Sequence, residues 1–184
     1  MIDIRIRRAS VDDAVAIARV RVESWRTTYR GMIPQAYLDG MSVEASATLW
    51  DRTLSAQSPR SQVFVAEDAD GVLGFAAGAV LPEAKHGFDA ELAAIYLKPA
   101  YQRLGLGSKL LGVTAAALVA QKVAGMIVWV IAGNKGARAF YEGHGAELIV
   151  EQPFQWDGMD LVEAGYGWRD LPALVAATRD AAVH

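Results

Sequence analysis

The stretch of sequence that decides the fold is IYLKPAYQRLGLGSKLLG, residues 95–112. An apolar run ends at Pro99, the segment QRLGLG follows, and a helical pattern begins directly after it. Gly105 and Gly107 therefore stand one residue apart at the junction of a predicted strand and a predicted helix. Because glycine has no Cβ atom, such a pair indicates either a tight turn or another group that approaches the backbone closely.

Two nucleotide-binding motifs do not fit this junction. The P-loop pattern G-x-x-x-x-G-K-[ST] is absent. The dinucleotide pattern G-x-G-x-x-G needs a third glycine where Leu110 stands, and an acidic residue about 20 positions further on, where the sequence reads AGMIVW. Two interpretations stay open: a strand–helix turn without a ligand, and a diphosphate cradle built from the unpaired N–H groups and dipole of the helix start. Arg103, Lys109 and Lys98 add positive charge nearby, although each also fits an ordinary solvated base, the interpretation we favour for Lys98.

Composition limits the class of protein. The chain has 184 residues, a hydrophobic fraction of 53% and a net charge of −3, which predict one domain spanning residues 1–184 and no nucleic-acid partner. The absence of cysteine excludes disulfides and a cysteine nucleophile, and His86, His144 and His184 lack metal-ligand spacing, so we expect no metal. The N-terminus MIDIRIRRAS has no apolar leader, and the longest apolar run, Leu110–Ala120, is too short to cross a bilayer. We therefore expect a cytoplasmic protein without a membrane partner.

Hydrophobic periodicity and turn residues predict the element order β-α-α-β-β-β-α-β-α-β-β. The predicted strands cover residues 2–6, 62–67, 72–81, 91–99, 125–133, 146–156 and 159–168. The predicted helices run from a Ser10–Asp13 capping box to about Gly31, and over residues 43–54, 105–121 and 134–145, the last with Asn134 as candidate cap. Asp70-Gly71 and Asp157-Gly158 signal tight hairpins, residues 82–90 are expected to form a loop, and residues 171–184 are a tail, either a short helix or frayed.

The order of these elements predicts the fold class. Neighbouring hairpins imply antiparallel pairs, and the strand–helix–strand segment after residue 91 implies a parallel pair. The expected fold is α/β (α+β), with a mixed, mostly antiparallel twisted sheet of about seven strands flanked by helices.

Two segments, ELAAIYLKPAYQRLGLGSKLL and WVIAGNKGARAFYEGHGA, resemble the GCN5-related N-acetyltransferases, the GNAT family, of the small bacterial type. The family signature Gln/Arg-x-x-Gly-x-Gly/Ala is matched here by Gln102, Gly105 and Gly107. The downstream family segment is matched by Asn134, Phe140, Tyr141, Glu142 and Gly145. The element order also fits, so the resemblance covers nearly the whole chain and implies the GNAT-like acyl-CoA N-acyltransferase fold.

The resemblance implies a binding site for acetyl-coenzyme A (acetyl-CoA). In the family the glycine loop binds the pyrophosphate, and the strand before it splays away from its parallel neighbour and pairs with the pantetheine arm. The residues implied for the co-substrate are Ile95, Tyr96, Leu97, Gln102, Arg103, Leu104, Gly105, Leu106, Gly107, Ser108, Asn134 and Tyr141. Gln102 stands where many members have arginine, which should weaken the local positive charge slightly.

Acetyl transfer to an amine needs a neutral amine, an oxyanion donor and a proton for the departing thiolate. The resemblance places Tyr141 beside the sulfur as the candidate acid. A backbone N–H near Leu97 is the candidate donor to the oxyanion. Glu91, which we expect to share a strand face with Ala93, Ile95 and Leu97, is either the general base with a pKa raised by desolvation or a solvated strand-end acid.

The remaining candidates concern the acceptor and rival chemistries. In the family the first two helices cover the acceptor site, so the resemblance implies that Trp25 and Tyr29 line the acceptor pocket, whereas Trp50 fits core packing better. Ser108 has no evident histidine–acid partner and His144 is expected at the surface after its helix, so the sequence does not predict a serine hydrolase.

These residues predict an N-acetyltransferase that moves the acetyl group of acetyl-CoA directly to a primary amine of an unidentified small-molecule or peptide acceptor. Direct transfer is favoured because no cysteine is available for an acyl-enzyme. A non-catalytic acyl-CoA-binding module and a nicotinamide-dependent oxidoreductase are the alternatives. Family habit suggests a homodimer formed through the last strands or the tail.

Overall fold

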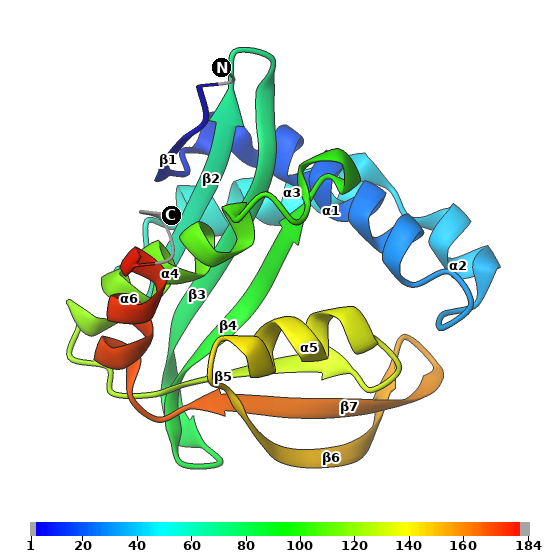
Figure 1. Ribbon diagram of the computed structural model, residues 1–184. Helices are drawn as coiled ribbons and strands as arrows, with labels where there is room; N and C mark the ends of the chain where they lie inside the picture. The colour runs from blue at the N-terminus through cyan, green and yellow to red at the C-terminus, as the bar shows by residue number, and fades with distance from the viewer. Residues whose placement is uncertain (1–2, 181–184) are drawn as a thin grey trace.

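The computed structural model describes residues 3–180 and contains seven strands and six α-helices in this range (Figure 1). The strands are β1 (Arg5–Arg8), β2 (Ser61–Asp68), β3 (Gly71–Lys85), β4 (Phe88–Leu97), β5 (Met126–Ile131), β6 (Glu147–Trp156) and β7 (Met159–Trp168). The helices are α1 (Ala14–Thr28), α2 (Gln35–Gly40), α3 (Val43–Ser55), α4 (Leu106–Val119), α5 (Lys135–Gly143) and α6 (Leu171–Asp180). Ile2 of the expected first strand and residues 181–184 of the expected tail lie outside the described residues.

All seven strands form one mixed sheet in the order β1-β2-β3-β4-β5-β7-β6. Every neighbouring pair is antiparallel except β4 and β5, which are parallel and joined through α4. The predicted fold class is therefore confirmed. Figure 1 shows that β5, β7 and β6 are turned strongly away from the direction of β2, β3 and β4, so the sheet changes course at the parallel pair.

The helices cover both faces of the sheet. On one face Ile17 and Val20 of α1 pack against Val63, Val65 and Phe75, with Trp50 and Leu54 of α3 beside them. On the other face α4, α5 and α6 form a second core with the strands, whose members include Leu111, Leu118, Tyr141, Tyr166 and Leu174. Trp50 packs edge-to-face on Phe75 at 5.1 Å, so its expected role in the core is confirmed.

The Ser10–Asp13 capping box and the Asn134 cap are present as predicted, and Ser42 is a further cap that was not predicted. Ser10 and Asp13 form a capping box before α1. Ser42 accepts a hydrogen bond from the Ala45 N–H at the start of α3, at 3.1 Å. Asn134 does the same for Ala137 at the start of α5, at 3.1 Å.

One predicted loop is a hairpin instead. Residues 82–90 were expected to be irregular, but β3 runs on to Lys85 and β4 begins at Phe88. The turn between them is His86-Gly87, with φ angles of 51° and 83°. Both positive angles suit the mirror-image turns of two-residue hairpins, which Asn-Gly or Asp-Gly usually signal. The prediction failed because histidine is an uncommon residue at the first of these positions.

Two helices also differ from expectation. The helix expected to reach Gly31 ends at Thr28, and α2 was not predicted at all. Within residues 3–180 no helix is long and apolar enough to span a bilayer, and no three His, Asp or Glu side chains gather as metal ligands would.

Candidate active site

Strands β4 and β5 separate after only a short paired segment. Residues 90–92 pair with residues 126–128 in parallel register. Beyond this segment β4 continues to Leu97 and β5 to Ile131, with no further pairing between the two strands. The backbone groups of β4 that point away from β3 therefore have no partner strand over residues 93–97.

A β-bulge lies where the separation begins. Ala77 of β3 pairs with Ala94, and the next residue, Gly78, pairs with Leu92, so Ala93 is an extra residue in β4. A bulge bends its strand and increases the local twist. The bulge therefore helps to direct the second half of β4 away from β5.

The bulge also reverses the alternation of side chains along β4. Leu92 before it and Ile95 after it both contact the core under α4. Glu91, the neighbour of Leu92, consequently points to the opposite face. The expectation that Glu91 shares a face with Ala93, Ile95 and Leu97 is wrong, because strict alternation does not hold across an inserted residue.

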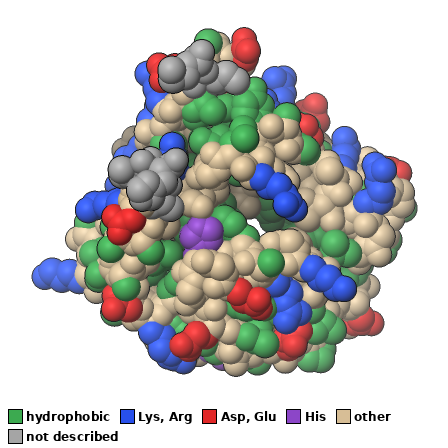
Figure 2. All heavy atoms as spheres, in the orientation of Figure 1, with side chains coloured by type: hydrophobic (Ala, Val, Ile, Leu, Met, Phe, Trp, Pro, Cys, Tyr) green, Lys and Arg blue, Asp and Glu red, His purple; other side chains and the backbone are tan. Residues whose placement is uncertain are grey.

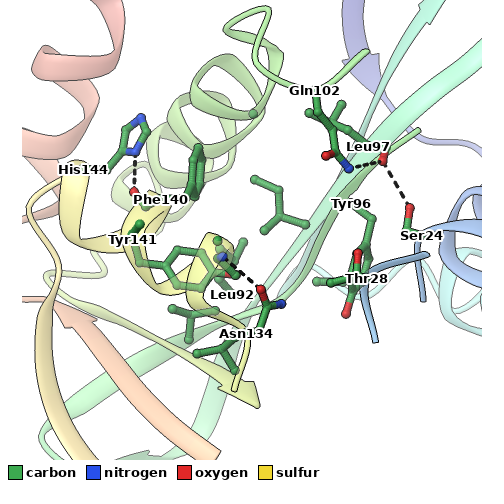
Figure 3. A pocket seen from close by; sticks show the side chains of 18 of the residues that line it. Ser24, Thr28, Leu92, Tyr96, Leu97, Gln102, Asn134, Phe140, Tyr141 and His144 are labelled. Carbon is green, nitrogen blue, oxygen red and sulfur yellow. Dashed lines mark hydrogen bonds between the residues drawn. The ribbon is translucent and has the colours of Figure 1, made fainter. Parts of the chain in front are cut away.

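The gap between the two strands is a cavity of about 630 Å³. Its walls are the facing edges of β4 and β5, the last turns of α1, the first turn of α4 and the inner side of α5. Figure 2 shows the surface hollowed near the centre of this view, and Figure 3 shows side chains converging on the gap. The predicted site residues that line it are Tyr29, Ile95, Tyr96, Leu97, Gln102, Arg103, Gly105, Gly107, Ser108, Asn134 and Tyr141.

The loop before α4 has an unusual backbone with a run of unpaired N–H groups. Arg103 and Gly105 both have positive φ angles, 61° and 78°. The backbone N–H groups of residues 103–108 have no hydrogen-bond partner within residues 3–180. Consecutive N–H groups of this kind at the start of a helix bind phosphate oxygens well. Gln102 donates its side-chain amide to the Leu97 carbonyl oxygen at 3.2 Å, which ties the loop to the end of β4 (Figure 3).

Gly105 and Gly107 are required for different structural reasons. Gly105 precedes the first residue of α4 in the left-handed region, and there is open space where its Cβ would lie. Gly107 lies in the first turn of α4, where a Cβ would come within 3.2 Å of the Phe140 ring of α5. Gly105 therefore shapes the loop, and Gly107 lets α4 and α5 approach each other.

Tyr141 points from α5 into the gap, and its residue is only 6% exposed (Figure 3). Its ring is held by Phe140 at 5.7 Å and by Trp168 at 5.8 Å. Burial, with a smaller contribution from Tyr29, raises the pKa of the Tyr141 phenol far above its ordinary value. The phenol is consequently protonated at neutral pH and can act as a proton donor.

Tyr29, Tyr96 and Asn134 place further polar side chains around the same cavity as Tyr141. Burial raises the pKa of Tyr29, while the nearby Asn134 and Tyr96 side chains lower it. Burial also raises the pKa of Tyr96, and Tyr29 and Tyr141 add to that rise. Three phenols and the Asn134 amide therefore occupy one largely desolvated region.

Glu91 lies beside the gap but does not line it. Its side chain is half-buried on the sheet face opposite α5, one residue before the last pair of β4 with β5. Burial raises its pKa, Lys85 lowers it and Glu163 raises it again. A carboxylate with a raised pKa is a better proton acceptor than an ordinary one.

Three other predicted residues lie outside the cavity wall. Leu106 is 4% exposed and belongs to the core, whereas Leu104 is 61% exposed at the surface. Trp25 is 8% exposed and packs on Tyr29 and on Trp156 of the β6–β7 hairpin, at 4.7 and 4.9 Å between ring centroids. Trp25 therefore supports the wall that Tyr29 forms.

The cavity also contains a pair that sequence reasoning missed. Ser108 Oγ lies 2.7 Å from His144 Nε2, and both residues line the gap. Ser108 therefore has a histidine partner, although no acid completes a histidine–acid pair within residues 3–180. The expectation that His144 is a surface residue is wrong, since the imidazole is half-buried between α4 and α5. No sequence signal connects the two residues, because they belong to different helices and meet only in the folded chain.

The sequence and the fold are similar to those of known acetyltransferases. Residues 21–146 match the family described as "Acetyltransferase (GNAT) family". An uncharacterized N-acetyltransferase of Bacillus subtilis, YuaI, is 39% identical over 173 residues, which cover 93% of this chain and 96% of that protein. A spermidine N(1)-acetyltransferase of Thermoplasma acidophilum is 31% identical over 111 residues, 59% of this chain and 66% of that protein.

A solved structure has the same fold. The PaiA N-acetyltransferase of Thermoplasma acidophilum, in complex with coenzyme A, superposes with a TM-score of 0.67 at 23% identity, covering 88% of this chain and 98% of that one. At this level of identity the likeness concerns the arrangement of helices and strands.

Proposed function

The chain belongs to the acetyltransferase (GNAT) family, and from that premise we propose that it transfers the acetyl group of acetyl-CoA directly to a primary amine. It is an acyltransferase, not the oxidoreductase or the non-catalytic module that the sequence left open. The observation that carries the proposal is the gap between β4 and β5, which is lined both by the loop with unpaired N–H groups and by Tyr141.

The residues of the gap fit the parts of acetyl-CoA. The free N–H groups of residues 103–108 suit its diphosphate, with Arg103 adding positive charge. The unpaired edge of β4 over Ile95, Tyr96 and Leu97 suits the amides of a pantetheine arm, which would add to the sheet as a further strand does. A cavity of about 630 Å³ is within the usual range for small-molecule sites. Bound there, acetyl-CoA supplies an activated acetyl thioester.

Tyr141 serves in this proposal as the general acid. A phenol held neutral by burial can give its proton to a sulfur that leaves as thiolate. The same desolvation would also raise the pKa of the departing thiol, which favours proton transfer to its sulfur. The backbone N–H groups near Leu97 are the candidate donors to the oxygen that gains negative charge.

Glu91 serves as the general base. The amine must lose a proton before it attacks, because alkyl ammonium groups have a pKa of about 10. Glu91 lies beside the end of the gap where β4 and β5 are still paired, on the sheet face opposite α5, and its raised pKa suits proton uptake from an amine directly or through a water molecule. Tyr29, supported by Trp25, would form the wall against which the acceptor rests.

The acceptor is proposed to be a small-molecule or peptide amine. The test is an amine panel assayed with acetyl-CoA, in which thiol release and the mass of the acetylated product are both measured. The proposal expects at least one amine to be acetylated with equal release of thiol, and much slower turnover by Tyr141→Phe. Thiol release that no amine accelerates, without any acetylated product, would overturn it. A homodimer and a cytoplasmic location stay predictions, and light scattering of the purified chain tests the first.

A further inference from the structure

Ser108 and His144 form a hydrogen-bonded pair at the wall of the cavity, outside the residues assigned to acid, base and acceptor. Ser108 Oγ lies 2.7 Å from His144 Nε2. His144 Nδ1 lies 2.7 Å from the Phe140 carbonyl oxygen (Figure 3). The His144 ring also packs on the Phe140 ring, at 4.3 Å between centroids. Both ring nitrogens are therefore engaged and the imidazole is fixed in orientation.

These contacts determine which atoms carry hydrogen. A carbonyl oxygen can only accept, so His144 Nδ1 must carry a proton and donate it to Phe140. In the neutral imidazole Nε2 is then an acceptor, and Ser108 must donate its single hydroxyl proton to it. Ser108 has no proton left for a ligand in this state. When His144 takes up a proton, Nε2 donates to Ser108 Oγ, and the hydroxyl proton becomes free to point into the cavity.

The pair lies next to the proposed anion site. Ser108 is in the first turn of α4, where its own N–H and those of residues 103–107 have no partner within residues 3–180. A phosphate placed there would meet a hydroxyl donor and a nearby positive charge only if His144 were protonated. Negative charge and protonation of the imidazole would stabilise each other.

We infer that Ser108 and His144 form a proton-linked phosphate site, so that binding the phosphorylated end of coenzyme A is accompanied by proton uptake at His144. The inference rests on the proposed function, since it assigns these residues to the nucleotide end of the same co-substrate. His144 is a positioning residue that acts through Ser108, whose hydroxyl is the group that contacts phosphate.

Several charged side chains surround the His144 imidazole, but none of them hydrogen-bonds to its ring. On the α6 side it shares a second hollow with Glu147, Arg169 and Asp170, of which Arg169 and Glu147 lie 3.8 Å apart. On α5 the Glu142 carboxylate accepts a hydrogen bond from Tyr166 at 2.6 Å. On α4 the neighbouring Lys109 is exposed. No carboxylate within residues 3–180 hydrogen-bonds to the His144 ring. A phosphate that accepts a hydrogen bond from Ser108 would therefore be the anion linked most directly to the imidazole.

The test is calorimetric titration of the protein with coenzyme A in two buffers of different ionisation enthalpy, which counts protons taken up on binding. At about pH 7 the native chain should take up a fraction of one proton per coenzyme A, because histidine changes charge between about pH 5 and pH 8. His144→Gln keeps a hydrogen-bonding amide but cannot be protonated, so it should take up none. It should bind coenzyme A about tenfold more weakly at pH near 6 and equally well at pH near 8.5.

His86→Gln is the matched control, because it makes the same change in the β3–β4 turn, outside the cavity wall. It should behave as the native chain, and Ser108→Ala should lose the proton uptake as His144→Gln does. A second titration with dephospho-coenzyme A identifies the phosphate: retained uptake assigns the diphosphate, and lost uptake assigns the 3′-phosphate. Proton uptake that persists in His144→Gln, or coenzyme A binding to the native chain without uptake, would overturn the inference alone. A chain that does not bind coenzyme A would overturn both this inference and the proposed function.

Discussion

A Cβ atom on Gly107 would lie 3.2 Å from Cε2 and 3.3 Å from Cζ of Phe140. The Phe140 ring has little room to move away, because it packs between the rings of His144, at 4.3 Å, and Tyr141, at 5.7 Å between centroids. Gly107 therefore sets the distance between the helix that begins at the proposed anion site and the helix that carries the candidate acid. Alanine variants of Gly105 and Gly107 can therefore distinguish the roles of the two residues.

Gly107→Ala should reduce stability by about 1 kcal/mol, because the Phe140 ring must shift to admit the methyl group. Phe140→Leu in the same chain should recover part of the loss, since it removes the ring atoms that clash. Urea unfolding of the two single variants and the double variant measures the coupling between the sites.

Gly105→Ala is the matched control, because there is space for its methyl group but its φ angle is 78°. It should cost about 1–2 kcal/mol through backbone strain alone. Phe140→Leu should not recover this loss. Equal recovery of both alanine variants would contradict the distinction.

Tyr141→Phe should lower kcat about 10²–10⁴-fold while leaving the affinity for coenzyme A nearly unchanged, because the ring remains and only the proton donor is lost. Single-turnover kinetics and calorimetric binding separate the two quantities. Tyr101→Phe is the control, since its hydroxyl faces Asp68 outside the cavity wall. A parallel loss of binding and turnover in Tyr141→Phe would favour a structural role.

Glu91→Gln should lower kcat/KM about 10²–10³-fold and remove the acidic limb of its pH profile, if Glu91 is the base. The base is active as carboxylate, so activity in the native chain should fall as the pH drops through its raised pKa. Glu163→Gln removes a like charge that raises this pKa, and should move the limb to lower pH. Lys85→Gln removes a charge that lowers it, and should move the limb to higher pH. An acidic limb whose position is the same in Glu163→Gln, Lys85→Gln and the native chain would show that a group other than Glu91 causes it.

Asp13→Asn should reduce stability by about 1–3 kcal/mol at neutral pH. Asp13 is 6% exposed and accepts two hydrogen bonds from Arg7, at 2.7 and 2.9 Å, and one from the Ser10 N–H at 2.7 Å. The Arg7 hydrogen bonds, more than any other contact, lower the pKa of Asp13 below its value in the unfolded chain. Its contribution is therefore complete above the unfolded pKa of about 3.9 and is lost as the pH falls through the lowered folded value.

Acid titration of stability tests this directly. The native chain should lose stability below about pH 4 more steeply than Asp13→Asn, because the variant has no carboxylate to protonate at that position. Asp12→Asn changes the exposed neighbour and should leave both the stability and its pH dependence as in the native chain. Parallel acid curves for the native chain and Asp13→Asn would show that the Arg7 contacts contribute nothing.

The parts of the fold that local chemistry dictates were predictable from the sequence. Asp157-Gly158 has φ angles of 49° and 77°, as its type of hairpin turn requires, and Ser42 and Asn134 cap the helices that follow them. The seven strands and the single parallel pair followed from such signals together with the alternation of apolar residues.

The parts that depend on distant contacts were not predictable. The extra residue at Ala93 is visible only in the register between β3 and β4, and it reversed the expected face of Glu91. The Ser108–His144 hydrogen bond joins two helices whose approach depends on the Gly107–Phe140 contact. The loop residues of the site were indicated by a motif, whereas these pairwise relationships arise from packing.

The short seam between β4 and β5 has a mechanical consequence. Because β4 and β5 pair only over residues 90–92 and 126–128, the sheet consists of two parts, β1–β4 and β5–β7, which are joined by this short segment and by packing against α4. A molecule bound between β4 and β5 would contact the unpaired edges of both parts. Binding should therefore stabilise the two parts together, so that they unfold in one transition and at a higher temperature than in the unbound protein.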